Sequence, residues 1–487
     1  MTLQTLKAPY GGQVNGSRVA SLVVVLAGAL PGCALLGESE ARQRHRDLAL
    51  EPEPVEPAPR PAGPVAPGEE ELAIQRKPAL GLLDCQRLSV LRSERLRAEA
   101  EHVHQSDLGV VSAASALSPQ ATYNFAYFKQ EEKVKALNAQ PNQTQTQWIQ
   151  LHQPVFRGFS DWFAIAAAND QVHASEAELR AAKLDVALGC GRAFYAVVSL
   201  EKTVETLVHS LKLEDERLAE VKAREDAGLA RKTERLFIET DRARTEADLA
   251  RSRHDLVAAR AELAYFTGVA DAALEAAGTA PSRPLPLDHY LDGSRNRPDI
   301  ALLAHQVELQ RHEVWAARGA FLPTMDATSN LWLHRDGTFR DVSWDVTLGL
   351  TWNFFDGGKE LAALRIAESH AREAERTYAD ACRHAESEIA SDYQALLGSL
   401  DQIPTLETRV RAAEENVKLL DVDYRAGIAT NLEAVEAENT RRQANLDLER
   451  ERYNARALEL QLRAASGDET LAPGAYPPSL GDEPGKK

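Results

Sequence analysis

The side chains that could carry chemistry are few and widely spaced. The chain has four cysteines: Cys33, Cys85, Cys190 and Cys382. Their spacing fits neither a disulfide framework nor a zinc site, and the last three are typical of small thiols on helices. Two histidine pairs stand out, His102 with His104 and His305 with His312, but solvated histidines on helices are commoner than metal ligands. No nucleophile elbow, phosphate loop or metal-ligand motif is found. We therefore predict no enzymatic activity, no metal and no cofactor.

The most specific chemical signal is a cysteine near the N-terminus. Basic residues precede the apolar run 19–30, which is too short to cross a bilayer as a mature helix and has the character of an export signal. The run ends in Leu30-Pro31-Gly32-Cys33, which resembles a bacterial lipobox. There the cysteine thiol receives a diacylglyceride and becomes the first residue of a palmitate-bearing lipoprotein. Pro31 departs from the usual small residue, so ordinary signal-peptide cleavage stays open.

Composition indicates what surrounds these residues. The 487 residues carry a net charge of −17 that is spread along the chain, so a nucleic-acid partner is not expected. Abundant Ala, Leu, Glu and Arg are typical of long helices. Seven prolines between positions 51 and 68 predict an extended tether, and the segment after Gly467 is expected to be a loose tail.

The body of the chain repeats itself at an offset of 199 residues. The triplet Phe156-Arg157-Gly158 corresponds to Phe355-Asp356-Gly357. Two further glycine pairs keep the same offset, Gly228 with Gly427 and Gly268 with Gly467. Aligned glycines on both sides of long helical stretches indicate an internal duplication.

Each half begins with an expected strand pair. From Trp344 to Phe354, apolar and polar residues alternate with the period of a half-buried strand. Its partner is expected at 323–335, and the first half has strands at about 119–128 and 147–156. The strand lengths suit tilted membrane spans, and six aromatic residues suit interfacial belts: Tyr123, Tyr127, Trp148, Trp332, Trp344 and Trp352. Four strands cannot close a barrel in lipid, so several chains must pool them.

Long helices follow each strand pair. The stretch 158–224 would span about 100 Å as a helix, and 228–266 plus a separate helix at 290–319 would match it in length. The second half repeats this with 359–424, interrupted by Pro404, and with 428–465 plus 78–116. Heptad spacing predicts coiled-coil pairing, with stripes at Val197, Val204, Leu211 and Leu218 and at Leu229, Leu236, Ala243, Ala250, Val257 and Ala264. Gly228 and Gly427 mark the turns.

Three motifs together carry a resemblance to a known family. They are Trp352-Asn353-Phe354-Phe355-Asp356-Gly357-Gly358-Lys359, then Arg297-Pro298-Asp299-Ile300 with Phe321-Leu322-Pro323, and Tyr424-Arg425-Ala426-Gly427-Ile428-Ala429-Thr430. In order and spacing they resemble the TolC family of outer-membrane efflux proteins, over about residues 80–467. The first half departs from the pattern, because it lacks a second glycine after Gly158 and has Glu225 where the second tip has Tyr424.

The resemblance implies an α+β membrane protein. The family fold is a homotrimer whose twelve-stranded β-barrel continues into a periplasmic α-helical coiled-coil barrel, with two repeats per chain. The implied function is a passive exit duct of a tripartite efflux system, fed by an inner-membrane pump through a periplasmic adaptor (membrane fusion) protein. The lipobox and tether resemble the lipid-anchored members that serve resistance-nodulation-division pumps. The implied location is the outer membrane, with the body reaching into the periplasm.

The resemblance also implies site residues. The adaptor is expected at two helical tips, formed by Ala227, Gly228 and Leu229 and by Ala426, Gly427 and Ile428. A hydrophobic contact within each hairpin is the alternative for the two apolar tip residues. Glu433 and Glu436 are expected to ring the pore as an acidic gate, with carboxyl pKa values raised by mutual repulsion. Tyr424 and Glu234 are expected to form a link that holds the tips closed. Ordinary solvated coiled-coil charges are the alternative for these glutamates.

The expected organisation therefore has six parts. They are a signal peptide with lipobox at 1–33, a Pro-rich tether at 34–77, a first repeat at 78–268, a connector at 269–289, a second repeat at 290–467 and a tail at 468–487. Within the same family, type I protein secretion and metal-ion efflux remain alternatives. A coiled-coil scaffold lipoprotein is the alternative from another class, although it leaves the recurring strand pairs unexplained.

Overall fold

The computed structural model describes residues 69–129, 143–270, 272–275, 281–336 and 340–472. The predicted signal peptide with Cys33, most of the tether, the first-half loop around 133–141 and the end of the tail lie outside these residues. The described chain forms two compact units. One comprises 117–155 and 327–347 and holds most of the sheet, and the other comprises the helical segments.

The first unit is built on a four-stranded sheet. Its strands are β1 (Gln120–Lys129), β2 (Gln143–Arg157), β3 (Thr324–Arg335) and β4 (Trp344–Thr351), in the order β1-β2-β3-β4. β1 and β2 are antiparallel, in a register that runs from Gln120 opposite His152 to Lys129 opposite Gln143. The expected strands are thus confirmed. β1 and β4 are the edges of the sheet, so each has one side without a strand partner in the described chain.

The two faces of the sheet differ in polarity. On β4 the alternate residues Trp344, Val346 and Leu348 are more than half exposed, which confirms an apolar face without a core beneath it. On the opposite face, Asp345 accepts hydrogen bonds from Trp332 Nε1 at 2.6 Å and from Asn330 Nδ2 at 2.8 Å. The ring of Trp148 lies 5.1 Å from that of Trp332. Trp148 and Trp332 therefore differ from the expected belt, because they pack together on the face that bears Asp345.

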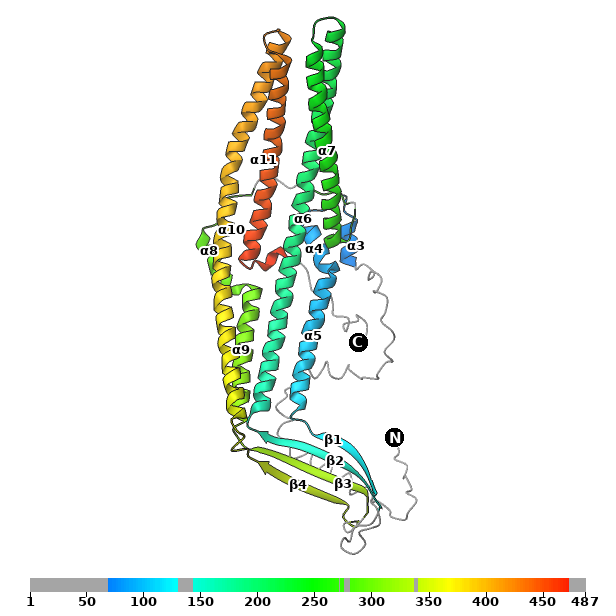
Figure 1. Cartoon of the computed structure of the whole chain (residues 1–487), viewed down its shortest axis with the longest axis vertical. Coiled ribbons are helices and arrows are strands. Elements are labelled where there is room, and N and C mark those ends of the chain that lie inside the picture. Colours follow the sequence, from blue (N-terminus) through cyan, green and yellow to red (C-terminus); the bar gives the residue numbers. More distant parts are fainter. Residues whose placement is uncertain (1–68, 130–142, 271, 276–280, 337–339, 473–487) are drawn as a thin grey trace. The chain divides into compact units, whose positions relative to one another are not determined.

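The second unit consists of two long helical hairpins. α6 (Ser160–Asp226) and α7 (Lys232–Thr267) form the first, and α10 (Lys359–Arg425) and α11 (Asn431–Ala465) form the second. α6 and α10 have 67 residues each, which corresponds to a length of about 100 Å. Figure 1 shows the turns of both hairpins at the same end of this unit. The glycines at equivalent positions of the two halves all have positive φ: Gly158, Gly228, Gly268, Gly357, Gly427 and Gly467.

Shorter helices extend the return path of each hairpin, as expected. α4 (Leu82–Arg92) and α5 (Glu94–Ser115) pack on α6, while α9 (Pro298–Gly319) packs on both α6 and α10. Figure 1 shows α5 and α9 continuing in line below α7 and α11. None of the described helices combines the length and the apolar character needed to cross a membrane.

Three helix boundaries differ from the sequence-based expectation. The helix expected at 78–116 is divided at Ser93, whose extended backbone (ψ 111°) and hydroxyl cap the start of α5. The helix expected at 290–319 consists of α8 (Leu287–Gly293), the 3-10 turn Ser294–Asn296 and α9. Here Pro298 forces Arg297 into an extended conformation. By contrast, α10 continues through Pro404 without interruption.

The predicted tether is too long at its C-terminal end. Residues Glu69–Gln75 form the helix α3, inside the segment 34–77 that was expected to be extended. The prolines end at position 67, so nothing prevents a helical turn after that point. Ile74 is 4% exposed and joins the main hydrophobic cluster, while Glu71 forms an ion pair with Arg92. These contacts hold α3 against the helical unit.

On the return helix α7, the heptad stripe that is buried within the chain differs from the stripe predicted from the sequence. On α6 the expected stripe begins with the buried Val197. On α7, however, the buried residues recur as Ile238, Thr245, Ser252 and Ala259. The expected stripe lies two residues away, and its members Leu236 and Val257 are exposed. A heptad pattern identifies an apolar stripe, but it does not identify the helix that the stripe contacts.

Candidate functional site

The two hairpin tips have the same backbone geometry. At the first tip, Gly228 has a φ of 75° and the amide of Leu229 donates to Arg224 O at 2.7 Å. At the second tip, Gly427 has the same φ and the amide of Ile428 donates to Asp423 O at 2.8 Å. Each glycine amide also bonds back to the preceding turn, which completes a Schellman motif. The left-handed conformation explains why glycine stands at both positions.

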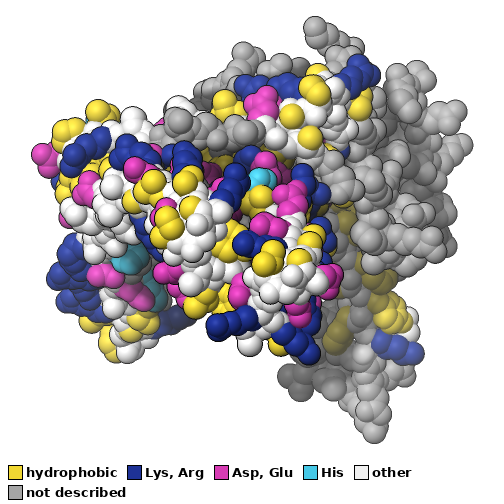
Figure 2. All heavy atoms as spheres, turned by 90° about the horizontal axis from the view of Figure 1, so that it is seen from above, with side chains coloured by type: hydrophobic (Ala, Val, Ile, Leu, Met, Phe, Trp, Pro, Cys, Tyr) yellow, Lys and Arg dark blue, Asp and Glu magenta, His cyan; other side chains and the backbone are white. Residues whose placement is uncertain are grey.

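An apolar side chain projects from each tip. Leu229 is 75% exposed and Ile428 is 77% exposed, so a hydrophobic contact within the hairpin covers little of either. Seen from the tip end, the molecule shows hydrophobic side chains interspersed with basic and acidic ones (Figure 2). Exposed apolar groups at a rigid turn are available to another protein.

Glu433 has a local structural role that the sequence analysis missed. Its carboxylate accepts hydrogen bonds from the amide of Thr430 at 2.7 Å and from the Thr430 hydroxyl at 2.8 Å. In return, the Glu433 amide donates to the Thr430 hydroxyl at 3.3 Å. This reciprocal pair is a capping box at the start of α11. The spacing Thr430-x-x-Glu433 is the signal that could have revealed it.

The capping box changes the expected titration of Glu433. The hydrogen bonds from the backbone and the side chain of Thr430 lower the pKa of the Glu433 carboxyl, whereas mutual repulsion at a gate was expected to raise it. In the single chain the ionised form is therefore favoured. The stability that this group contributes is present above its unfolded pKa and is lost as the pH falls through the lowered pKa. Glu436, one turn further along α11, is exposed.

The expected link between Tyr424 and Glu234 is not among the contacts of the described single chain. Glu234 instead accepts a hydrogen bond from the amide of Arg231 at 3.3 Å, at the start of α7. Tyr424 is buried, and its ring lies 5.0 Å from the guanidinium carbon of Arg224 and 5.5 Å from that of Arg217. A position in the first turn of a helix favours capping of that helix, which explains the different partner of Glu234.

A buried polar cluster joins the two hairpins near their tips. Arg442 of α11 donates from Nη1 to Glu214 Oε1 of α6 at 2.6 Å and to the Thr245 hydroxyl of α7 at 2.8 Å. The Thr245 hydroxyl donates in turn to Glu214 Oε1 at 2.8 Å. Glu214 and Arg442 are 8% and 9% exposed. Burial raises the pKa of the Glu214 carboxyl, and the hydrogen bond from Thr245 and the charge of Arg442 oppose this.

His305 and His312 of α9 contact residues of α6 and not each other. His312 Nδ1 lies 2.7 Å from Asp170 Oδ2, and the ring of His305 lies 5.3 Å from that of His173. In the part of the chain that the structure describes, no group of three or more His, Cys, Asp or Glu side chains has the arrangement of a metal site.

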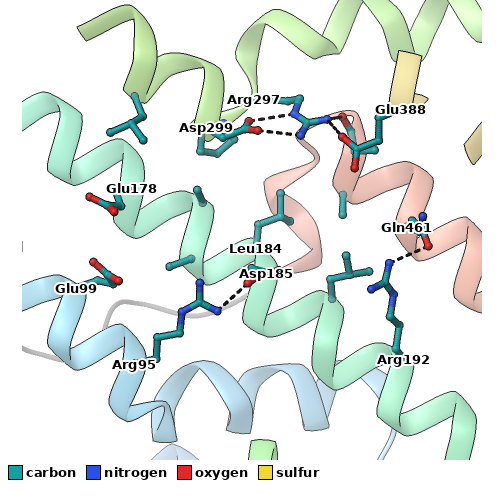
Figure 3. Close-up of a pocket in the computed structure, with 17 residues that line it drawn as sticks. Arg95, Glu99, Glu178, Leu184, Asp185, Arg192, Arg297, Asp299, Glu388 and Gln461 are labelled. Atoms are coloured by element: carbon teal, nitrogen blue, oxygen red, sulfur yellow. Dashed lines mark hydrogen bonds and ion pairs between the residues drawn. The ribbon is translucent and has the colours of Figure 1, made fainter. Parts of the chain in front are cut away.

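A cavity of about 410 Å³ lies among α5, α6, α9 and α11 (Figure 3). Three arginines line it, and each has a polar partner within its wall. Arg95 contacts Asp185 at 2.7 Å, and Arg192 contacts Gln461 at 2.8 Å. The third, Arg297, has several partners. Because the three arginines already have polar partners, they connect the surrounding helices and are not available to a ligand. We call this group of contacts a structural joint between helices.

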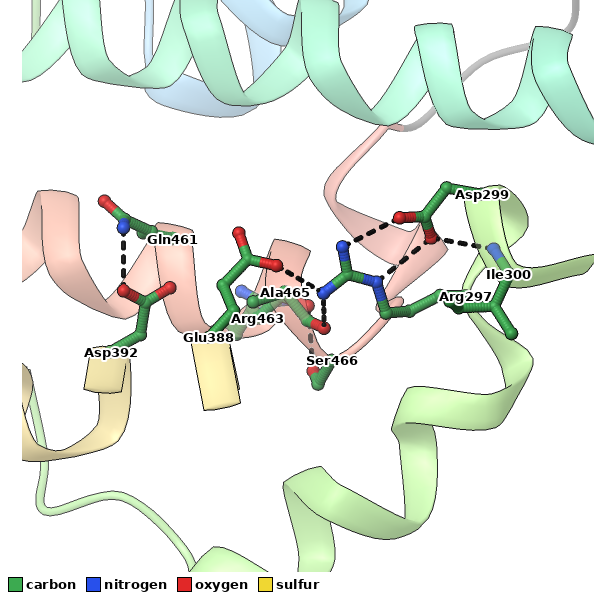
Figure 4. A network of polar contacts seen from close by, with 9 residues as sticks. All are labelled: Arg297, Asp299, Ile300, Glu388, Asp392, Gln461, Arg463, Ala465 and Ser466. Atoms are coloured by element: carbon green, nitrogen blue, oxygen red, sulfur yellow. Dashed lines mark hydrogen bonds and ion pairs between the residues drawn. The ribbon is translucent and has the colours of Figure 1, made fainter. Parts of the chain in front are cut away.

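Arg297 is the centre of that joint (Figure 4). It donates from Nε and Nη2 to the carboxylate of Asp299, at 3.0 and 2.9 Å. Its Nη1 donates to Glu388 Oε2 at 2.7 Å and to Ala465 O at 2.9 Å. One guanidinium thus connects the start of α9, the middle of α10 and the last turn of α11, which an ammonium group could not do in this geometry. The sequence motif Arg297-Pro298-Asp299 therefore has a structural explanation.

Comparisons with known proteins agree with this architecture. Residues 294–468 match the model of the family described as outer membrane efflux protein. The outer membrane protein OprJ of Pseudomonas aeruginosa is 27% identical over 190 residues, which cover 37% of this chain and 39% of OprJ. The solved structure of CusC superposes with a TM-score of 0.72 at 18% identity, over 85% of this chain and 99% of that one.

Over residues 294–468, the chain is similar to the outer membrane efflux protein family. The resemblance found in the sequence is confirmed, and with it the expectation of an outer-membrane protein. Two further matches cover similar shares. The cation efflux system protein CusC of Escherichia coli is 29% identical over 35% of this chain and 38% of CusC. The alkaline protease secretion protein AprF of Pseudomonas aeruginosa is 25% identical over 42% of this chain and 46% of AprF. The matched region spans less than half the length of each curated relative.

The buried cluster between the hairpins generates a stability prediction. Arg442→Met leaves the Glu214 carboxylate buried without its cation, and we expect the free energy of unfolding to fall by about 3 kcal/mol. Adding Glu214→Gln should restore most of the loss. The free energy of unfolding of the single variant should also approach the parental value as the pH is lowered, because protonation of Glu214 removes the buried charge.

Thermal unfolding followed by circular dichroism in detergent measures these differences. Arg441→Met is the matched control, because Arg441 is next in sequence and pairs with Glu438 three residues away on its own helix. Its removal should change the free energy by at most about 0.5 kcal/mol. Equal losses in Arg442→Met and Arg441→Met would mean that the cluster does not join the hairpins.

Proposed function

We propose that this chain is the outer-membrane exit duct of a tripartite efflux system. Small molecules delivered by an inner-membrane pump and a periplasmic adaptor protein pass through it by diffusion, and the chain performs no chemical step. The observation that carries this proposal is one sheet with an exposed apolar face and two unpaired edges, in the same chain as two long hairpins. A soluble protein would cover such a face with a core.

The edges of the sheet support assembly as a homotrimer. Backbone groups without partners are costly in lipid, so β1 of one copy must pair with β4 of another. Three copies of four strands give a closed twelve-stranded barrel. The exposed stripe on α7, which includes Leu236 and Val257, would then pack against a neighbouring copy and close a helical barrel. The duplicated organisation of the chain, with its repeats at 78–268 and 290–467, would give this barrel an even distribution of helices.

The N-terminal segment is proposed as an anchor. Lipidation of Cys33 and a proline-rich tether would hold the body at the membrane while leaving barrel assembly to the strands. Mass spectrometry of the mature N-terminus should show a diacylglyceryl adduct on Cys33. A mature chain that begins at another residue would contradict the anchor, although it would leave the duct proposal intact.

The hairpin tips are proposed as the adaptor contact. The exposed Leu229 and Ile428 would insert into an apolar surface of the partner, so the double variant Leu229→Glu, Ile428→Glu should abolish export and crosslinking to the cognate adaptor. Leu83→Glu, at an exposed leucine on α4, is the control and should export normally. Normal export by the tip variant, present at parental amounts as a trimer, would reject the contact.

Glu433 and Glu436 are proposed as a cation-selective ring at the pore. In a trimer these positions bring six carboxylates around one axis, which favours cations. Because Glu433 also caps α11, the informative variant is Glu433→Gln with Glu436→Gln, which removes the charges but keeps an oxygen for Thr430. Thr430→Ala is the control, since it weakens the helix start by about 1 kcal/mol without removing a charge.

Single-channel recordings in planar bilayers distinguish these variants. The double glutamine variant should lose cation preference and block by divalent ions, while Thr430→Ala should keep both. Tyr424→Phe tests the proposed closing link, and Glu234→Gln its acidic partner; both should raise open conductance if the link forms between copies. Parental ion preference in the double variant would remove the acidic gate from these positions.

Ducts for protein secretion or for metal-ion efflux are second candidates. They are favoured by the matches to AprF and CusC, which are named for protease secretion and cation efflux. The same barrel would serve these cargoes, because the pump selects what enters the duct.

A further inference from the structure

Two cysteines that are far apart in the sequence lie on facing helices. Cys85 is on α4 and Cys190 is on α6, more than a hundred positions later in the chain. Both have no exposed surface, and both belong to the same hydrophobic cluster. Both are free thiols in this structure. The third described cysteine, Cys382 on α10, is only half-buried and lies outside that cluster.

The contacts around them show that the two thiols lie on opposed surfaces. One helical turn of α4 contacts one turn of α6. In this contact, Gln86 Nε2 donates a hydrogen bond to Ala187 O at 3.4 Å. A Cβ added at Gly191 would lie 3.6 Å from Gln86 Nε2 and 3.7 Å from Leu82 Cδ1. Gln86 follows Cys85 directly, and Gly191 follows Cys190 directly.

The groups that act on the Cys190 thiol indicate that the two thiols are neighbours. Ser89, one turn after Cys85 on α4, forms a hydrogen bond with the thiol of Cys190. Burial is the main cause that raises the pKa of the Cys190 thiol to about 12, and the neighbouring Cys85 contributes to the same rise. Burial likewise raises the pKa of Cys85 to about 12. At neutral pH both groups are therefore protonated, so neither is an effective nucleophile once α4 is docked.

We propose that Cys85 and Cys190 form a structural disulfide when the chain folds after export. The bond forms before α4 docks on α6, while the thiols are still exposed to solvent. Its oxidant is a protein disulfide of the thiol-exchange type. One thiolate attacks that disulfide, and the second thiolate then displaces the oxidant from the mixed disulfide. Two thiols lose two protons and two electrons, and the oxidant leaves as a dithiol.

The consequence is a covalent connection between the N-terminal helices and α6. The loop that it closes contains α5, β1 and β2. Once formed, the bond would be shielded by the cluster that includes Leu88 and Phe194, which protects it from exchange. The inference rests on the proposed function only in placing the mature chain in an oxidising compartment, where disulfides persist.

The test counts thiols in the full-length chain expressed with its own signal. Cells are quenched with acid, the protein is denatured, and a polyethylene glycol maleimide is added with or without prior reduction. In a Cys382→Ser background, we expect two more additions after reduction than without reductant, whatever the state of Cys33. Peptide mass spectrometry should recover the segments around Cys85 and Cys190 as one species, two hydrogen atoms lighter than the separate peptides. Equal numbers of additions with and without reductant would overturn the proposal.

Two controls make either result informative. In Cys85→Ser, Cys190 has lost its partner and should be labelled without reduction. The chain that begins at residue 34 stays in the reducing cytoplasm, and there both thiols should be labelled. Membrane fractionation of the same sample tests the proposed function separately. A chain with free thiols in the outer membrane rejects only the disulfide, whereas a periplasmic chain outside the membrane rejects only the duct.

Discussion

The backbone groups along the outer edges of β1 and β4 have no strand partner within the described chain, and this limits how the sheet can be placed in a membrane. The sheet has four strands in sequential order, with an apolar face that has no core beneath it. In water the face is unfavourable, and in lipid the edges are unfavourable. A closed barrel shared by several copies satisfies both requirements, because it pairs the edges and turns the apolar face to lipid. The short β4 and the longer β2 are consistent with a staggered closure of this kind.

The helical unit also leaves a surface without a partner in the single chain, but this surface consists of apolar side chains and not of backbone groups. Each hairpin buries one heptad seam within the chain, while a second apolar stripe on α7 remains exposed. Arg297 fixes where α9, α10 and α11 meet, and the cluster of Glu214, Thr245 and Arg442 fixes α11 against the first hairpin near the tips. The path of the helices is therefore defined at two levels by arginines with several partners, the partly buried Arg297 and the buried Arg442. Such groups are specific in geometry, since a shift of one helix would leave a charge unpaired.

Much of this architecture was predictable, because it depends on local patterns. The alternation from Trp344 onwards identified β4, and the glycines at an offset of 199 residues identified the turns. The sequence could not show which apolar stripe of a helix packs within its own chain. For this reason the buried stripe of α7 differs from the predicted one. The breaks at Ser93 and Arg297 were missed, although the Arg297-Pro298 dipeptide is a known helix boundary signal. The capping of α11 by Glu433 and Thr430 and the proximity of Cys85 and Cys190 differ in how far the sequence could reveal them. The first was readable as a capping box, whereas the second depends on tertiary packing.

We propose that the four strands of one chain are completed by strands of other copies. Native mass spectrometry of the full chain, extracted in mild detergent from the outer membrane, tests it directly. We expect a single species with three times the mass of the mature chain, which persists until the detergent unfolds the sheet. A stable folded monomer that keeps its strands in the membrane would rule out closure by other copies, because its edges would lie unpaired in lipid.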